Sequence, residues 1–355
     1  MRQPSSREAL QKLGIRHPII QGPFGGGLST ERLTAAVSNL GGLGSYGAYQ
    51  LPPDEIGRVA DRIRAQTDKP FALNLWVSDH DAGALSPEDF ERVYRGFEPY
   101  YRELGVDKPR PPERYHHRFE DQVEALLEAR PPVFSFVFGV PPAAVLAECR
   151  RRGIVTSGAA TTLAEAEALD AAGVDLIVAT GFEAGGHRPS FLARAEDSLM
   201  GTMALTPLVA DRVKAPVIAA GGLADGRGIR AVLTLGAQAA QLGTAFLACE
   251  ESGTTDAHRE LLFSDRARNT TLTRAFTGRL ARGMTNRWTE EMASRVGELP
   301  PFPIQSWFLS KLKPAAVKAG RTDLVSLWAG QATPNLRHRT VPALMASLLE
   351  ELSVR

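Results

Sequence analysis

The sequence is poor in cysteine and has no surplus of charge of either sign. Only Cys149 and Cys249 occur among 355 residues, and they form no CxxC pair. Neither a structural zinc site nor a disulfide framework is therefore indicated. Lys and Arg total 41 and Asp and Glu total 40, which gives a formal net charge of +1. Without a basic surplus we expect no nucleic-acid partner, and a small molecule fits better.

Long apolar stretches are also absent. No uninterrupted apolar run reaches the roughly 18 residues that a transmembrane helix needs, and residues 1–14 contain no apolar segment typical of a signal peptide. We therefore expect a cytoplasmic protein without a membrane span. The sequence leaves its oligomeric state open.

Several motifs of well-known functional sites are missing. There is no early GxGxxG turn, no Walker loop GxxxxGK[ST] and no GxSxG elbow. No set of His, Asp, Glu and Cys has the spacing of metal ligands, so no metal is predicted.

What the sequence does contain is a repeated pattern of strand and helix. Short apolar runs end in Gly, Pro or Ser and are mostly followed by segments with helical spacing, such as 161–172 and 226–237. The apolar runs hardly alternate with polar residues, which is typical of parallel strands buried on both faces. The eight candidate strands are 18–21, 43–47, 71–77, 133–139, 153–158, 175–181, 216–222 and 239–245.

Eight β-α repeats favour an α/β fold of the (β/α)8 TIM-barrel type, with an open doubly wound sheet as the alternative. We expect the barrel to span residues 1–250, with an insertion at 78–130 that forms either a pocket wall or an inert excursion. The Arg-rich segment 251–310 is predicted to be a small helical subdomain after the eighth strand, and residues 311–355 to be helices that pack on the barrel.

One histidine follows a predicted barrel strand in a glycine-rich loop. His187 lies in GFEAGGHRPSF, after the sixth strand, and barrel active sites lie at the carboxyl ends of the strands. An imidazole titrates near neutrality and can act as general acid or base, so His187 is our catalytic candidate. For Glu183 we favour a structural role in orienting the loop. Arg188 is expected either to bind an anionic group or to form a surface ion pair.

Glycine-rich loops also follow the seventh and eighth strands, at Gly221-Gly222 and at 241–244. In many barrels these two loops bind a phosphate through backbone N–H groups, and glycine allows the backbone to approach closely. The sequence therefore predicts a phosphate site there.

The chain resembles the nitronate monooxygenase family, formerly called 2-nitropropane dioxygenases, which are FMN-dependent TIM-barrel enzymes. The resemblance rests on HPIIQGPFGGGLSTERLTAAVSNLGGLGSYGA, FALNLWV, FSFVFG, GFEAGGHR, AAGGLADGRG and QLGTAF. PFPIQSWF and SLWAGQ are similar to the subgroup often called class I. The resemblance implies oxidation of alkyl nitronates, or of nitroalkanes, with dioxygen to a carbonyl compound and nitrite.

The resemblance also implies a role for individual residues. His187 matches the family's catalytic histidine. The phosphate of FMN is expected at Gly221, Gly222, Gln241, Leu242, Gly243 and Thr244, and its ring system at Gln21, Gly22, Pro23, Phe24, Asn74, Thr180 and Gly185.

Three positions depart from the family pattern, and two other functions compete with it. Thr180 stands where glutamine is common, Pro23-Phe24-Gly25 where Pro-Met-Ala is common, and Pro189 where glycine is usual. These departures touch the expected substrate site. The alternatives are an FMN-dependent NAD(P)H:quinone or enoyl-thioester reductase on the same scaffold, and a non-catalytic barrel that binds a phosphorylated ligand.

Overall fold

Eight parallel strands wrap into a barrel in the computed structural model, which describes residues 7–77 and 84–353. Their order is β1-β9-β8-β6-β5-β4-β3-β2, and a parallel bridge from Ile20 to Leu43 joins β1 to the start of β2. The predicted TIM barrel and all eight of its strands are thereby confirmed. The strands are β1 (Ile19–Gln21), β2 (Gly44–Gly47), β3 (Phe71–Trp76), β4 (Val133–Val137), β5 (Val155–Ala160), β6 (Leu176–Thr180), β8 (Val217–Ala220) and β9 (Ala239–Leu242).

Both faces of the barrel strands are buried, as their apolar sequences predict. In β6, Leu176 and Val178 pack into one apolar cluster together with Ile218 of β8, whereas Ile177 and Ala179 pack into another. Alternate residues of each strand therefore serve the barrel interior and the contact with the surrounding helices. Helix α1 (Glu8–Leu13) adds its buried side chains to the first of these clusters.

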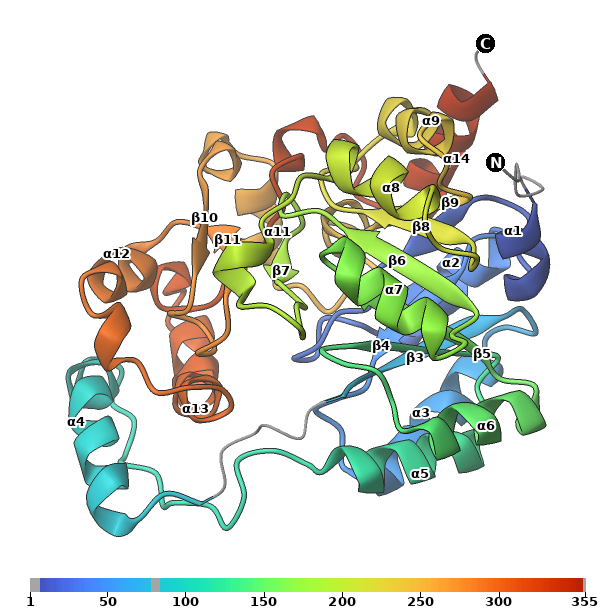
Figure 1. The fold of residues 1–355 in the computed structure, drawn as a ribbon. Coiled ribbons are helices and arrows are strands. Elements are labelled where there is room, and N and C mark those ends of the chain that lie inside the picture. Colours follow the sequence, from blue (N-terminus) through green and yellow to red (C-terminus); the bar gives the residue numbers. More distant parts are fainter. Residues whose placement is uncertain (1–6, 78–83, 354–355) are drawn as a thin grey trace.

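Helices surround the barrel (Figure 1). The helix predicted at 161–172 begins after Thr162, whose hydroxyl caps it by accepting a hydrogen bond from the Glu165 N–H. The C-terminal α14 packs on α9 and α2. These helices are α2 (Glu31–Asn39), α3 (Pro53–Arg64), α5 (Phe119–Ala129), α6 (Ala143–Arg152), α7 (Leu163–Ala171), α8 (Thr202–Ala210), α9 (Gly226–Thr234), α10 (Thr244–Leu247) and α14 (Val341–Ser353).

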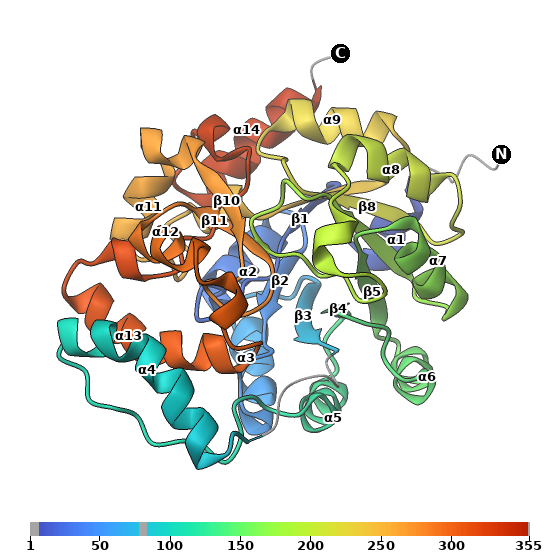
Figure 2. The same cartoon turned by 60° about the vertical axis from the view of Figure 1, so that its left-hand side comes forward.

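The predicted insertion 78–130 contains two helices with different surroundings, and residues 78–83 lie outside the described part. Helix α5 packs against α3, β3 and α6 like the other barrel helices. Helix α4 (Pro87–Glu103) instead lies against α13 (Ile304–Lys318), beside the barrel (Figure 2). The division of the chain into barrel, subdomain and C-terminal helices stays a prediction.

The interpretation of residues 251–310 as helical needs one correction. The segment contains the helices α11 (Asp256–Leu262) and α12 (Arg287–Ala293), but also two antiparallel strands, β10 (Thr270–Thr273) and β11 (Ala281–Met284). Strand β11 also pairs with β7 (Gly186–His187), which follows barrel strand β6. A strand stabilised by a partner so distant in sequence is poorly visible to local helical periodicity. Short 3-10 helices lie at Ala195–Ser198, Asp265–Arg268, Val296–Glu298, Thr322–Leu324 and Thr333–Asn335.

No helix within residues 7–77 and 84–353 is both long enough and apolar enough to cross a membrane.

Aromatic packing joins α4 to α13, and this contact generates a stability prediction. The Phe308 ring is fully buried, with centroids 5.1 Å from Phe90 and 4.9 Å from Phe97. Phe308→Ala should lower the free energy of unfolding by about 3–5 kcal/mol because it leaves a cavity. Urea denaturation would measure the loss. Val296→Ala, at a side chain that is 48% exposed, is the control and should stay within about 0.5 kcal/mol; similar losses in both variants would contradict this account.

Candidate active site

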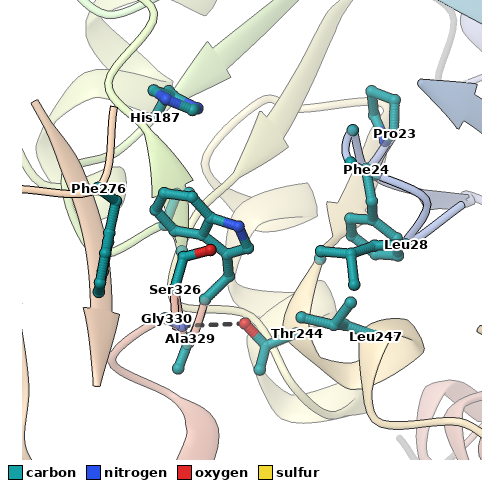
Figure 3. A pocket seen from close by; sticks show the side chains of 18 of the residues that line it. Pro23, Phe24, Leu28, His187, Thr244, Leu247, Phe276, Ser326, Ala329 and Gly330 are labelled. Atoms are coloured by element: carbon teal, nitrogen blue, oxygen red, sulfur yellow. Dashed lines mark hydrogen bonds between the residues drawn. The ribbon is translucent and has the colours of Figure 1, made fainter. Parts of the chain in front are cut away.

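A cavity of about 460 Å³ lies at the carboxyl ends of the barrel strands. Its size is in the range of small-molecule sites, about 300–1,000 Å³. Pro23, Phe24 and Leu28 face it from one side and His187 and Phe276 from the other (Figure 3). The cavity brings together most of the predicted site residues, namely Gly22, Pro23, Phe24, Asn74, Thr180, Gly185, His187, Gly221, Gly222, Gln241, Gly243 and Thr244.

Two predicted residues do not line this cavity. Gln21 is fully buried, and its side-chain oxygen accepts a hydrogen bond from the Ser45 N–H at 2.8 Å. Leu242 points into an apolar cluster that includes Ile19 and Phe246. Both belong to barrel strands in which successive side chains alternate in direction. The sequence located the strand ends but not the direction of these two side chains.

The loops after β8 and β9 form one end of the cavity. Gly221 and Gly222 have φ angles of +106° and +67°, which glycine adopts without strain. Gly243, with a negative φ of −97°, precedes the short helix α10. A Cβ atom built there would have Phe24 Cε1 as its nearest neighbour at 3.9 Å, so the backbone is open toward the cavity. Thr244 Oγ1 accepts a hydrogen bond from the Gly330 N–H at 2.9 Å (Figure 3).

His187 lies in β7, which pairs with β11 through the partners His187 and Ala281. Its Nε2 is 2.8 Å from Thr277 Oγ1, in the turn between β10 and β11. Burial, together with the nearby positive charge of Arg279, lowers the pKa of His187 to about 3. The imidazole is therefore neutral at physiological pH.

Aromatic rings surround His187 on several sides. The Trp76 ring meets it edge-on with centroids 4.8 Å apart, and the Trp328 ring is 5.3 Å away. Phe138, at 6.2 Å, adopts an unusual φ of +67° directly after β4. Our sequence analysis named none of these residues. Their positions at the end of β3 and directly after β4 could have indicated Trp76 and Phe138, whereas Trp328 follows no barrel strand.

Two more polar side chains line the cavity without having been predicted. His258 Nε2 donates to the Trp328 carbonyl at 3.1 Å, and burial lowers its pKa to about 4. Lys313 Nζ donates to the Gly26 carbonyl at 3.2 Å, and burial lowers its pKa as well. Both come from segments after the barrel strands. No group of His, Cys, Asp and Glu in the described residues could hold a metal ion.

The two charged residues beside His187 have structural roles. Glu183 accepts hydrogen bonds from the Thr202 N–H and hydroxyl at 3.0 Å, which agrees with its expected loop-orienting role. Both expectations for Arg188 are wrong, because it is buried and donates to backbone carbonyls, including those of Ser198 and Thr161 at 3.1 Å. Burial lowers its pKa to about 10.

The loop that follows is also fixed, because Glu165 accepts from the N–H groups of Phe191 and Leu192 at 2.6 and 3.1 Å. Pro189, where we expected a departure from the family loop, lines the cavity together with His187.

The fold and this cavity define the class of the protein, a TIM-barrel enzyme with its site at the strand ends. The model of the family described as "Nitronate monooxygenase" matches residues 7–351. The chain is 42% identical to "Nitronate monooxygenase" of Paraburkholderia phytofirmans over 354 residues, which cover 99% of this chain and 96% of the relative. It is 35% identical to "Probable nitronate monooxygenase" of Staphylococcus haemolyticus, with coverage of 98% and 97%. The chain belongs to the nitronate monooxygenase family, whose members are oxidoreductases.

Solved structures agree with this membership. Nitroalkane oxidase from Streptomyces ansochromogenes is similar with a TM-score of 0.89 and 37% identity, covering 97% of this chain and 98% of that one. FabK from Thermotoga maritima is similar with a TM-score of 0.74 and 27% identity, covering 97% and 95%.

The lowered pKa of His187 predicts a pH dependence of stability. In the unfolded chain an imidazole has a pKa near 6.5, so between about pH 6.5 and pH 3 the unfolded chain binds more protons than the folded one. Stability is therefore lost as the pH falls through this window. His187→Asn should make the loss shallower, by at most about 1.4 kcal/mol per pH unit.

Urea unfolding at several pH values between about 7 and 4 would measure this slope. Because His258 titrates in the same window in both proteins, the difference between wild type and variant isolates His187. Identical slopes would contradict a half-buried, neutral His187.

Proposed function

We propose that this protein oxidises alkyl nitronates, and also neutral nitroalkanes, with dioxygen to a carbonyl compound and nitrite. The observation that carries the proposal is the position of His187, which shares one cavity with the glycine loops after β8 and β9. Membership of the nitronate monooxygenase family supports the same reaction.

We infer that the cofactor is FMN. A phosphate fits at Gly221, Gly222 and Gly243, which line the cavity. At Gly243 a Cβ atom would have Phe24 Cε1 as its nearest neighbour at 3.9 Å, so the backbone there is open to a phosphate oxygen. The cavity continues along Gly22, Asn74 and Gln241, which offer a flat ring system both backbone contacts and amide groups. When bound, FMN supplies the redox chemistry, which is the transfer of electrons from the substrate to dioxygen.

His187 handles the proton in this proposal. A neutral imidazole accepts a proton, so His187 can take the α-proton of a nitroalkane. With a nitronate, which has already lost that proton, His187 only positions the anion through a hydrogen bond. The rings of Trp76 and Trp328 cover the imidazole and limit its contact with water.

Two measurements on the purified protein with its flavin distinguish nitronate oxidation from the competing reductase reaction. Oxygen consumption should start on adding alkyl nitronates, including propionate 3-nitronate. Anaerobic mixing with NADH or NADPH should leave the flavin oxidised. Rapid bleaching by a nicotinamide, with no response to nitronates, would overturn the proposal, and a protein that cannot bind FMN would favour the non-catalytic barrel.

Replacing His187 should affect the oxidation of a neutral nitroalkane and of its nitronate to different extents. His187→Asn should reduce kcat/KM for a neutral nitroalkane by about 10²–10⁴-fold, the usual contribution of a general base. The loss for the preformed nitronate should stay below about tenfold, or 1.4 kcal/mol. Steady-state oxygen consumption measures both, with His117→Asn at an exposed histidine as control. Equal losses on both substrates would mean that His187 binds the substrate without accepting its proton.

A substitution at the proposed phosphate site should lower the affinity for FMN. Gly243→Leu places a side chain in open space at a negative φ, so the fold should persist while the phosphate is displaced. The FMN affinity of the apoprotein, measured by flavin fluorescence, should fall at least about tenfold. Gly57→Leu, where a Cβ atom meets nothing within 4 Å, is the matched control. Unchanged affinity in Gly243→Leu would place the phosphate elsewhere.

A further inference from the structure

We propose that Thr277 is a positioning residue that holds His187 in the tautomer with its proton on Nε2, so that Nδ1 is the nitrogen that accepts the substrate proton. The inference rests on the proposed role of His187 as a base and adds which of its two nitrogens acts. It concerns a residue from the hairpin after the barrel, far in sequence from every strand-end motif.

The backbone of the β10–β11 hairpin sets the distance between the side chains of Thr277 and His187. Strand β11 pairs with β7 at Ala281 and Arg282, opposite His187 and Gly186. The Arg188 N–H donates to the Leu280 carbonyl at 2.8 Å, which extends this pairing. Thr277, which precedes these paired residues in the turn of the hairpin, is therefore held close to the imidazole by the backbone pairing.

The Thr277 hydroxyl has three polar neighbours but only one proton to donate. Its oxygen is 2.8 Å from His187 Nε2, 3.3 Å from the Arg279 carbonyl and 3.3 Å from the Arg279 backbone nitrogen. The backbone N–H can only donate to this oxygen, and the carbonyl can only accept from it.

These constraints favour one arrangement of protons. If the hydroxyl donates to the Arg279 carbonyl, His187 Nε2–H donates to the hydroxyl, and all three contacts are hydrogen bonds. If the hydroxyl donates to Nε2 instead, the contact with the carbonyl is lost. Since a buried polar group is stabilised by each partner it keeps, the first arrangement is preferred. Nδ1 is then the nitrogen with a free lone pair.

Arg279 supports the same state of the ring. Its guanidinium stacks on Phe138 at 4.1 Å and on Phe302 at 4.5 Å, and also lies over Trp76, whose edge contacts His187. A fixed positive charge at this place disfavours the imidazolium. The ring thus carries a single proton, and Thr277 decides which nitrogen carries it.

The test reads the tautomer directly by NMR of the flavin-loaded protein with ¹⁵N-labelled histidine. The signals of His187 are those that disappear in His187→Asn. We expect the pattern of Nε2–H with an unprotonated Nδ1 in wild type and in Thr277→Ser, and a loss of this preference in Thr277→Val. An Nδ1–H pattern in the wild type would overturn the proposal. So would an unchanged pattern in Thr277→Val with the His258 signals, the marker of an intact fold, in place.

Kinetics give the second readout. Thr277→Val should lower turnover of a neutral nitroalkane by about tenfold more than turnover of its nitronate, and Thr277→Ser should restore it. Equal losses in the Val and Ser variants would overturn the positioning role. If the wild-type protein shows the expected tautomer but oxidises no nitronate, the proposed function fails while the tautomer assignment stands.

Discussion

The short antiparallel pairing between β7 and β11 is the interaction on which the site depends. A TIM barrel presents loops at its strand ends, and a loop alone does not fix a side chain to the precision that proton transfer requires. Here the loop after β6 becomes a strand at Gly186–His187 because the hairpin after the barrel pairs with it. The same hairpin supplies Thr277 to the imidazole and Arg279 to the aromatic rings beside it. Backbone hydrogen bonds thus define the position, the partner and the electrostatic surroundings of His187 together.

The surroundings of this histidine disfavour its charged form. An imidazole in an apolar environment gives up its charged form, and the ring stays neutral far below its ordinary pKa. Only the neutral ring accepts a proton, but the same lowered pKa makes this imidazole a weaker base than an ordinary histidine. The charged residues next to it in the sequence do not stabilise a protonated imidazole, because their side chains bond elsewhere. Glu183 is directed to Thr202, away from a role as partner of the imidazole, and Arg188 is held by backbone carbonyls.

The sequence allowed the barrel and one side of the site to be predicted, because these depend on local pattern. Apolar runs followed by Gly, Pro or Ser identified every barrel strand, and the rule that barrel sites lie at strand ends led to His187 and the glycine loops. The same rule does not give the direction of a side chain, which is why Gln21 and Leu242 were assigned to the cofactor although they point elsewhere than the cavity.

The other side of the site could not be predicted because it is built by contacts between distant segments. The hairpin strands carry β-branched residues in Thr270–Thr273, a local signal for a strand. The surrounding arginines and helical segments obscured this strand signal. Strand β7, which pairs with β11, lies about a hundred residues earlier, and no sequence periodicity indicates a pairing over such a separation. Thr277 therefore had no recognisable context in the sequence. The family resemblance included SLWAGQ, which contains Trp328, but none of its stretches covered the hairpin. It follows that variation in substrate among proteins with this barrel is better sought in the hairpin and the C-terminal segments than in the glycine loops, because Thr277 and Trp328 from those segments lie beside His187.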